Sequence, residues 1–167
     1  GGQHFNVNRS EEFLKAGLTM KTIRVQANGN IKESMSFENI DYIEVAECED
    51  WFESRLYELY SARFMFVIFR EQTPGEEDYA LDGAFFWTMP QEDLFVAQEY
   101  WQHIRQNVLE GKIDAQYWWK ATDRRKFHVR PKATKATDLA PAPNGTLAKK
   151  YCDDDTYKLI NGVLDRL

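Results

Sequence analysis

Residues 18–25 place the tightest constraint on the fold, because they alternate between two faces with one lysine on the more apolar of them. One face carries Leu18, Met20, Thr22 and Arg24, and the other carries Thr19, Lys21, Ile23 and Val25. A period of two predicts a β-strand. A lysine on such a face needs a carboxylate, a phosphate or a path to water to remain charged. We therefore predict a central strand that is entered by a turn from Glu12 and that carries Lys21 as an ion-paired or functional residue.

Length and composition fit a chain with one hydrophobic core. The chain has 167 residues, of which 43% are apolar, and we expect a single domain over residues 3–167. Gly1 and Gly2 resemble the remnant of a cleaved tag, so we expect a piece of a longer protein. With neither a membrane-spanning run nor a signal-peptide pattern in the sequence, we expect a cytoplasmic protein without a membrane partner.

The two cysteines, Cys48 and Cys152, lie far apart in the sequence and show no zinc-ligand spacing. A zinc site or a disulfide framework is therefore not predicted, and both are expected to be reduced thiols.

Hydrophobic patterning and turn residues predict mixed α and β structure. Helices are expected over 50–60, with Asp50 as N-cap, from Pro90 to the cap at Gly111, and over 153–167. Residues 37–45 are expected to be a connector. The other predicted strands cover residues 63–70, 79–89 and 127–130, with turns over 27–30 and 72–78.

Positive charge is concentrated in one segment of an acidic chain. The net charge is −6, yet residues 120–151 hold nine Lys or Arg and two Asp, so this segment carries +7 and the remainder −13. A loop that presents Arg130 with flanking cations can neutralise phosphates, and arginine suits a bidentate contact with guanine. The alternative is a solvated face with incidental charge. The candidate DNA contacts in this segment are Arg124, Arg125, Lys126, Arg130, Pro131, Lys132, Lys135, Lys149, Lys150 and Tyr151.

The strand, the turn after it and the following motifs resemble the MutH mismatch-repair nucleases and the Sau-type restriction endonucleases that cut at GATC. The resemblance is carried by Gly17–Ile23, Ala27–Asn30, Lys32–Ser36 and Asn39–Tyr42, and by the order of 63–69, 83–90 and the long helix. It implies an α/β (α+β) restriction-endonuclease-like fold, with a central mixed sheet flanked by helices. In that family an Asp and a Glu-x-Lys set bind divalent metal, and the lysine polarises or positions the attacking water.

The chain departs from the family at its metal ligands. Glu12 stands at the position of the Asp, and Thr19 stands at the position of the Glu, before Lys21. A hydroxyl is a much poorer ligand for a hard dication than a carboxylate. The resemblance therefore implies a degenerate site of Glu12, Thr19 and Lys21, no metal or cofactor in this domain, and magnesium for the parent enzyme.

Residues 129–133 resemble the family's Val-Arg-Pro-x-Ala segment, which places an arginine at a GATC guanine. The resemblance implies base readout by Arg130 with support from Pro131 and Lys132. Phosphate contacts by Lys149 and Lys150 and an adenine-edge role for Tyr151 follow from the next family element.

The leading hypothesis is a catalytically inactive effector domain, from the C-terminal part of a type II restriction endonuclease that recognises GATC. It would bind a second GATC site in double-stranded DNA and stimulate cleavage by the N-terminal catalytic domain of the same chain. Dimerisation on DNA is a further expectation.

Two alternatives remain open. One is an active magnesium-dependent endonuclease in which Glu12, Glu33 or Glu38 supplies a migrated carboxylate, and the other is a structural or dimerisation module. Lys21 paired with Glu33 across the hairpin fits either the leading hypothesis or a purely structural reading.

Overall fold

The computed structural model describes residues 15–32, 35–123, 125–133 and 135–155. The chain divides into two compact units, of which unit 1 comprises residues 1–33 and 58–91 and unit 2 comprises residues 34–57 and 92–167. Each unit has its own sheet. The expectation of one domain over residues 3–167 stays a prediction.

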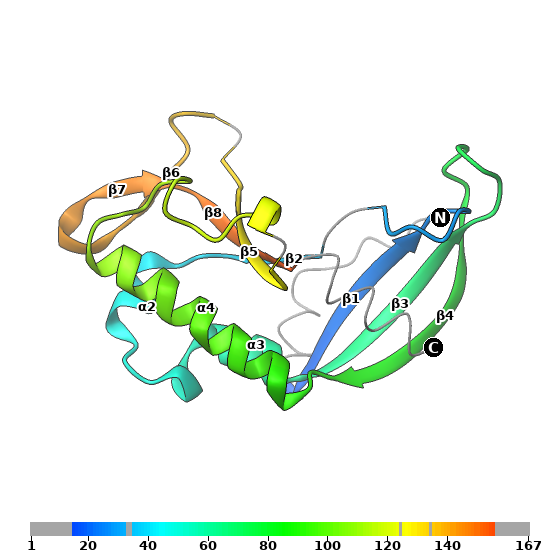
Figure 1. The fold of residues 1–167 in the computed structure, drawn as a ribbon, viewed down its shortest axis with the longest axis horizontal. Helices are drawn as coiled ribbons and strands as arrows, with labels where there is room; N and C mark the ends of the chain where they lie inside the picture. The colour runs from blue at the N-terminus through cyan, green and yellow to red at the C-terminus, as the bar shows by residue number, and fades with distance from the viewer. Residues whose placement is uncertain (1–14, 33–34, 124, 134, 156–167) are drawn as a thin grey trace. The chain divides into compact units, whose positions relative to one another are not determined.

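Unit 1 is built on a three-stranded mixed sheet in the order β1-β3-β4 (Figure 1). Strand β1 (Leu18–Val25) runs parallel to β3 (Arg63–Glu71), and β4 (Tyr79–Thr88) runs antiparallel to β3. The alternation predicted for β1 is confirmed, since Thr19, Ile23 and Val25 are buried and Lys21 is half-buried on the same face. In the part of the chain that the structure describes, the middle strand is β3 and not β1. The continuous apolar run of β3 suits the position with a neighbour on each side.

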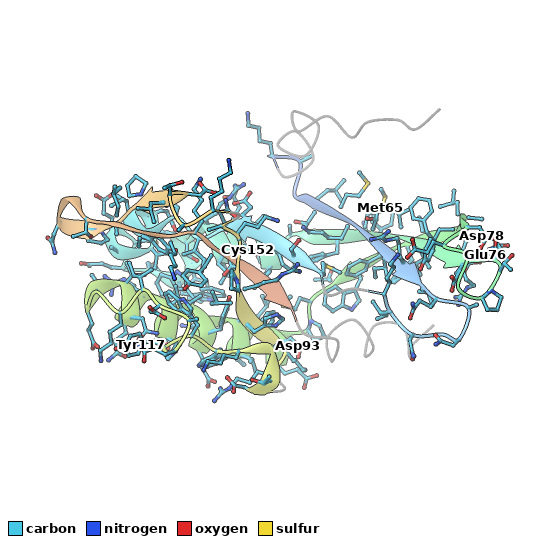
Figure 2. The ribbon with its side chains drawn as sticks, turned by 90° about the horizontal axis from the view of Figure 1, so that it is seen from above. Met65, Glu76, Asp78, Asp93, Tyr117 and Cys152 are labelled. Carbon is cyan, nitrogen blue, oxygen red and sulfur yellow. The ribbon has the colours of Figure 1, made fainter. Side chains whose placement is uncertain are left out.

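A buried carboxylate ties together the two turns at one end of this sheet. Glu71 is 7% exposed, and its carboxylate accepts the Ala27 N–H at 2.9 Å and the Glu77 N–H at 3.2 Å. Asp78 accepts the Thr73 N–H at 2.8 Å within the same hairpin loop, which confirms the predicted turn. Figure 2 labels Asp78 at this loop. Backbone N–H donors lower the pKa of Glu71 and of Asp78, so both carboxylates favour the ionised form.

Aspartates cap the first two short helices of unit 2. Helix α2 (Tyr42–Glu47) begins at Asp41, whose carboxylate accepts two backbone N–H groups, and the 3-10 helix η1 (Trp51–Glu53) begins at Asp50. Asp50 accepts the Phe52 N–H at 3.0 Å, so its predicted role as N-cap is confirmed.

A single helix over residues 50–60 is wrong. Ser54 has an extended conformation (ψ 152°) and separates η1 from α3 (Arg55–Ser61). The break turns Trp51 into the core at 4% exposure and leaves Phe52 63% exposed, whereas a continuous helix would bury Phe52.

A second sheet, in the order β2-β8-β5, forms the base of unit 2. Strand β8 (Tyr151–Asp155) lies between β2 (Ser36–Asn39) and β5 (Phe127–Pro131) and is antiparallel to both. The expected connector over 37–45 is therefore wrong, because its first residues pair with β8 and Asp41 starts α2. The predicted strand over 127–130 is confirmed.

Helix α4 (Gln91–Leu109) packs against this sheet, as the sequence predicts. Its stripe of Leu94, Ala97, Trp101, Ile104 and Val108 is buried, and Gly111 follows it with φ 73°. Tyr100 is fully buried, and its hydroxyl lies 3.0 Å from the His128 carbonyl oxygen and 2.8 Å from Asp153 Oδ1. Its ring stacks on Phe127 in β5, with 5.8 Å between centroids.

Asp153, Asp154 and Asp155 do not begin a helix, contrary to the prediction. They continue β8, where Asp153 is 7% exposed and accepts the Tyr100 hydroxyl. Strand β8 pairs with β2 on one side and with β5 on the other, and the Asp153 carboxylate accepts a buried hydrogen bond. These interactions outweigh the tendency of aspartates to start a helix. The rest of the expected helix, residues 156–167, lies outside the described residues.

A small hairpin completes unit 2. Strands β6 (Leu139–Pro141) and β7 (Leu147–Lys149) pair across η3 (Pro143–Gly145), where Asn144 and Gly145 both have positive φ. A further turn of 3-10 helix, η2 (Ala121–Asp123), precedes β5. None of the helices in the described ranges is both long enough and apolar enough to cross a membrane.

Candidate functional site

Thr19 occupies the first candidate site, and its hydroxyl already has a structural partner. Thr19 is 7% exposed, and Oγ1 donates to the carbonyl oxygen of Leu59 at 3.1 Å. Leu59 lies in the last turn of α3, where carbonyls lack an intrahelical partner. An ionised carboxylate has no hydrogen to donate and would face the carbonyl oxygen with like partial charge. The local structure thus suits a hydroxyl at residue 19 better than a metal-binding glutamate.

The residues around Thr19 in the described chain do not fit a magnesium ion. Among the residues that the structure describes, no group of three or more His, Cys, Asp or Glu is arranged to hold a metal. Glu38, one of the carboxylates considered as a replacement, is bound by Arg55 through Nε–Oε2 and Nη2–Oε1 contacts of 2.9 and 2.5 Å. Glu12 and Glu33 lie outside the described residues. The suggested ion pair between Lys21 and Glu33 is therefore also outside the described part of the chain.

Antiparallel pairing of β5 and β8 brings together several of the predicted DNA contacts. Arg130 is opposite Cys152, Pro131 is opposite Tyr151, and the Lys132 N–H donates to the Lys150 carbonyl at 3.0 Å. Arg130, Pro131, Lys132 and Lys149 are exposed, whereas Lys150 is half-buried. We call this group, Arg130, Pro131, Lys132, Lys149, Lys150 and Tyr151, the basic strand end.

Two lysines predicted to contact phosphate are ion-paired within the protein. Lys150 Nζ lies 2.5 Å from Asp138 Oδ1, and Lys126 pairs with Asp93 in the first turn of α4. Asp93 is 5% exposed, so the second pair is partly shielded from water. Figure 2 shows Asp93 at one end of α4. DNA phosphates must compete with these carboxylates for both lysines.

The remaining candidates lie around these strands. Arg125 is exposed, and its guanidinium carbon lies 4.0 Å from the centroid of the Trp119 ring. Lys135 is exposed in the loop between β5 and β6. The backbone carbonyl of Lys149 accepts a hydrogen bond from the Tyr42 hydroxyl. Arg124 lies outside the described residues.

Tyr151, for which an adenine-edge role is expected, is buried at 3% exposure in the chain without DNA. It packs edge-to-face on Trp118, with 5.6 Å between ring centroids. Burial raises the pKa of its hydroxyl. Tyr151 and Trp118 line a hollow beside Arg130, together with Lys120 and Thr122. The sequence analysis did not select Trp118, Lys120 or Thr122 as site residues. The adjacent pair Trp118–Trp119 before a basic run was the signal that could have found them.

A family model described as the DNA mismatch repair enzyme MutH matches residues 2–99. The chain belongs to the MutH family. It is also 33% identical over 109 residues to the type II restriction enzyme Sau3AI of Staphylococcus aureus. That alignment covers 60% of this chain and 22% of the enzyme, so the chain spans about a fifth of the length of this relative.

Membership of the MutH family confirms the predicted fold class. The mixed sheet of unit 1 and the helices of both units belong to an α+β restriction-endonuclease-like fold. This fold is used by proteins that act on DNA, and the chain is a restriction-endonuclease-type domain. The family match includes Thr19 and Lys21 but ends within α4, before the basic strand end.

Proposed function

We propose that this chain is a DNA-binding effector domain that does not itself cut DNA and that belongs to a type II restriction endonuclease recognising GATC. It binds a second GATC site, with Arg130 reading a guanine, and stimulates an N-terminal catalytic domain of the same protein. The catalytic domain uses magnesium, and dimerisation on DNA belongs to the same proposal.

The observation that carries the proposal is the hydrogen bond from Thr19 Oγ1 to the Leu59 carbonyl. It gives the hydroxyl a packing role at a position where cleavage needs a metal-binding carboxylate. A domain of this family that keeps its fold without that carboxylate retains one useful property, which is affinity for DNA. We therefore infer that its role is binding and not hydrolysis.

The basic strand end supports the DNA-binding half of the proposal. Arg130 is exposed at the end of a paired strand, so its guanidinium is presented from a rigid backbone. Lys132 and Lys149 flank it as exposed cations, which suits phosphate contacts on either side of a base contact. Family membership and the similarity to Sau3AI agree with a duplex DNA partner.

The test compares binding to two short duplexes of equal composition, one with GATC and one scrambled, at about 150 mM salt. We expect at least about tenfold tighter binding to GATC, since a bidentate base contact contributes roughly 1–3 kcal/mol of discrimination. Arg130→Ala should remove this preference. The control Lys149→Ala should weaken both complexes alike, because a phosphate contact carries no sequence information. Equal binding of both duplexes by the native chain would contradict the proposal.

Catalysis and stimulation need separate measurements. Incubation of the domain with a GATC plasmid and magnesium should give no nicking, and sustained nicking that Lys21→Ala abolishes would favour the active-nuclease alternative. In the full-length parent enzyme, a plasmid with two GATC sites should be cut faster than one with a single site. Arg130→Ala should erase that difference while leaving the rate on the single-site plasmid unchanged.

A further inference from the structure

The β6–β7 hairpin of unit 2 presents one apolar face to solvent. Leu139 is opposite Lys149, and Pro141 is opposite Leu147, so these four side chains share a face of the hairpin. All four residues are exposed, with Leu147 at 64% and Leu139 at 38%. Of the four, only Lys149 has a role in the proposed function, which leaves the apolar part of this face unexplained.

The opposite face of the hairpin packs onto the protein. Ala140 and Ala148 are half-buried on that face, and Ala142, which follows β6, is 3% exposed. Strand β6 and the short helix η3 both contact α2, and the Tyr42 hydroxyl donates to the Lys149 carbonyl. Packing on one side therefore gives the exposed leucines on the other side a defined position.

The exposed face continues from the basic strand end. Strand β7 leads through Lys150 into β8, which pairs with β5 (Figure 1). Leu139 is opposite Lys149, three residues along the chain from Cys152, and Cys152 is the partner of Arg130. Three residues of a strand span at most about 10 Å. The first and last base pairs of GATC are about as far apart, since three steps of about 3.4 Å separate them. With Arg130 at a guanine, Leu139 therefore lies within reach of the rest of the site.

Apolar side chains beside a cation match the major groove of DNA at a thymine. Thymine presents its C5-methyl group in that groove, where apolar side chains contact it, and a two-stranded β-ribbon is narrow enough to enter. The guanine edge proposed for Arg130 lies in the same groove. Lys149 suits a phosphate at its border, and no Asp or Glu is among the four residues of the face. A protein partner would accept the two leucines but does not require Lys149 or the position beside Arg130.

We propose that the β6–β7 hairpin enters the major groove at the GATC site and that Leu139 contacts the methyl group of a thymine in the site. This inference rests on the proposed function, because Arg130 places the hairpin on the site. Leu147 is two residues further along the ribbon, about 7 Å away, and lies over base pairs beyond the site. Leu139 thus adds recognition of an A·T pair to the recognition of guanine by Arg130.

The test replaces thymine by uracil, which lacks only the C5-methyl group, in both strands of the GATC duplex. The base pairs next to the site are G·C, so that no other thymine is close to the hairpin. We expect the native chain to bind the uracil duplex at least about threefold more weakly, because burial of one methyl group contributes a factor of this order. The same replacement in a scrambled duplex should have no effect, which controls for a general influence of the methyl groups.

Variants of the two leucines assign the effect. Leu139→Ala should remove the difference between the thymine and uracil duplexes, because the shortened side chain no longer reaches the methyl group. Leu139→Met keeps a long apolar side chain and should retain most of the difference. Leu147→Ala is the matched control, since it removes the more exposed leucine of the same face and should leave the difference intact.

The proposal is overturned if the native chain prefers GATC to the scrambled duplex but binds the thymine and uracil duplexes alike. That result is also expected if the leucines bind a protein instead of DNA. A difference that persists in Leu139→Ala overturns it as well. Failure of the proposed function is distinguishable, because the GATC and scrambled duplexes then bind alike, and this inference fails with it.

Discussion

Thr19 in β1 donates its hydroxyl hydrogen to the backbone carbonyl of Leu59 in α3 across an Oγ1–O distance of 3.1 Å. The two residues are 40 positions apart in sequence, so this bond joins a strand to the end of a helix. It satisfies a helix carbonyl that would otherwise be buried without a donor. The residue that we propose to stand at a lost metal-ligand position is therefore part of the packing of unit 1.

Thr19→Val should destabilise the chain by about 1 kcal/mol, because it keeps the shape and removes the hydrogen bond. Thr19→Glu should cost more, since it buries a carboxylate against a carbonyl oxygen. Urea unfolding measures both, and Thr22→Val, at an exposed position of the same strand, is the control. A Thr19→Glu protein that is as stable as the native chain, or that magnesium stabilises, would contradict the packing role.

Removal of the carboxylate that holds Lys150 should strengthen DNA binding of every sequence. Asp138→Asn releases the ammonium for a phosphate, so the plot of log affinity against log salt should become steeper by about 0.9. The ratio of GATC to scrambled affinity should stay the same. Asp82→Asn removes an equal charge from an exposed pair with Arg70 in unit 1 and serves as the control. An unchanged slope for Asp138→Asn would mean that Lys150 does not reach a phosphate.

The two turns that Glu71 ties together in unit 1 should lose local stability at low pH. Glu71, Glu77 and Asp78 all have a lowered pKa in the folded chain, the first and third through backbone N–H donors and the second chiefly through Lys32. Carboxylates with a lowered folded pKa stabilise the fold above their unfolded values of about 4, and this contribution is lost as pH falls through the folded pKa.

Hydrogen exchange should therefore show lower protection of the Ala27 and Glu77 amides at pH 3 than at pH 6, after correction for intrinsic rates. Glu71→Gln should have low protection at both values. Equal protection of the native chain at both values would show that Glu71 does not hold the two turns together.

Tyr42 should make the chain sensitive to alkali. Its hydroxyl donates to the Lys149 carbonyl, and burial is the largest cause of its strongly raised pKa. A raised pKa stabilises the fold fully below the unfolded value of about 10, and this stabilisation is lost as pH rises above it. Tyr42→Phe should cost about 1 kcal/mol at pH 8 by urea unfolding and should show a smaller loss between pH 8 and 11 than the native chain. An identical alkaline loss in both proteins would assign the effect to another group.

Local patterns predicted the three strands of the unit 1 sheet, helix α4 and strand β5, but not β2, α2, β6 or β7. Strand β1, the hairpin β3–β4 and helix α4 carry strong periodic signals, and Asp50 and Gly111 mark helix ends by their chemistry. The errors arose where distant pairing decides the structure. Asp153 reads as a helix start, yet β2 and β5 on either side of β8 and the Tyr100 hydroxyl fix it in a strand.

The sequence was enough to predict which basic residues lie at the candidate site. It was not enough to predict their burial and their partners within the protein. The exposed positions of Arg130 and Lys132 follow from a basic strand that ends at Pro131. Burial of Tyr151 against Trp118 does not follow from sequence, because it depends on the segment after α4 folding back onto β8. The internal ion pairs do not follow from sequence either. Asp93 is 33 positions from Lys126, and Asp138 and Lys150 meet only because they flank the β6–β7 hairpin.

Under the proposed function, the internal ion pairs of Lys126 and Lys150 bear on how the protein would find a specific site in a genome. A surface of unpaired cations would dissociate slowly from DNA of any sequence. Millions of non-specific sites would then compete with the few specific ones. Carboxylates that act as built-in counterions shorten each such encounter. Rapid release from ordinary sequence, followed by a long stay only where a base contact adds to the binding, is the search behaviour that this charge arrangement favours.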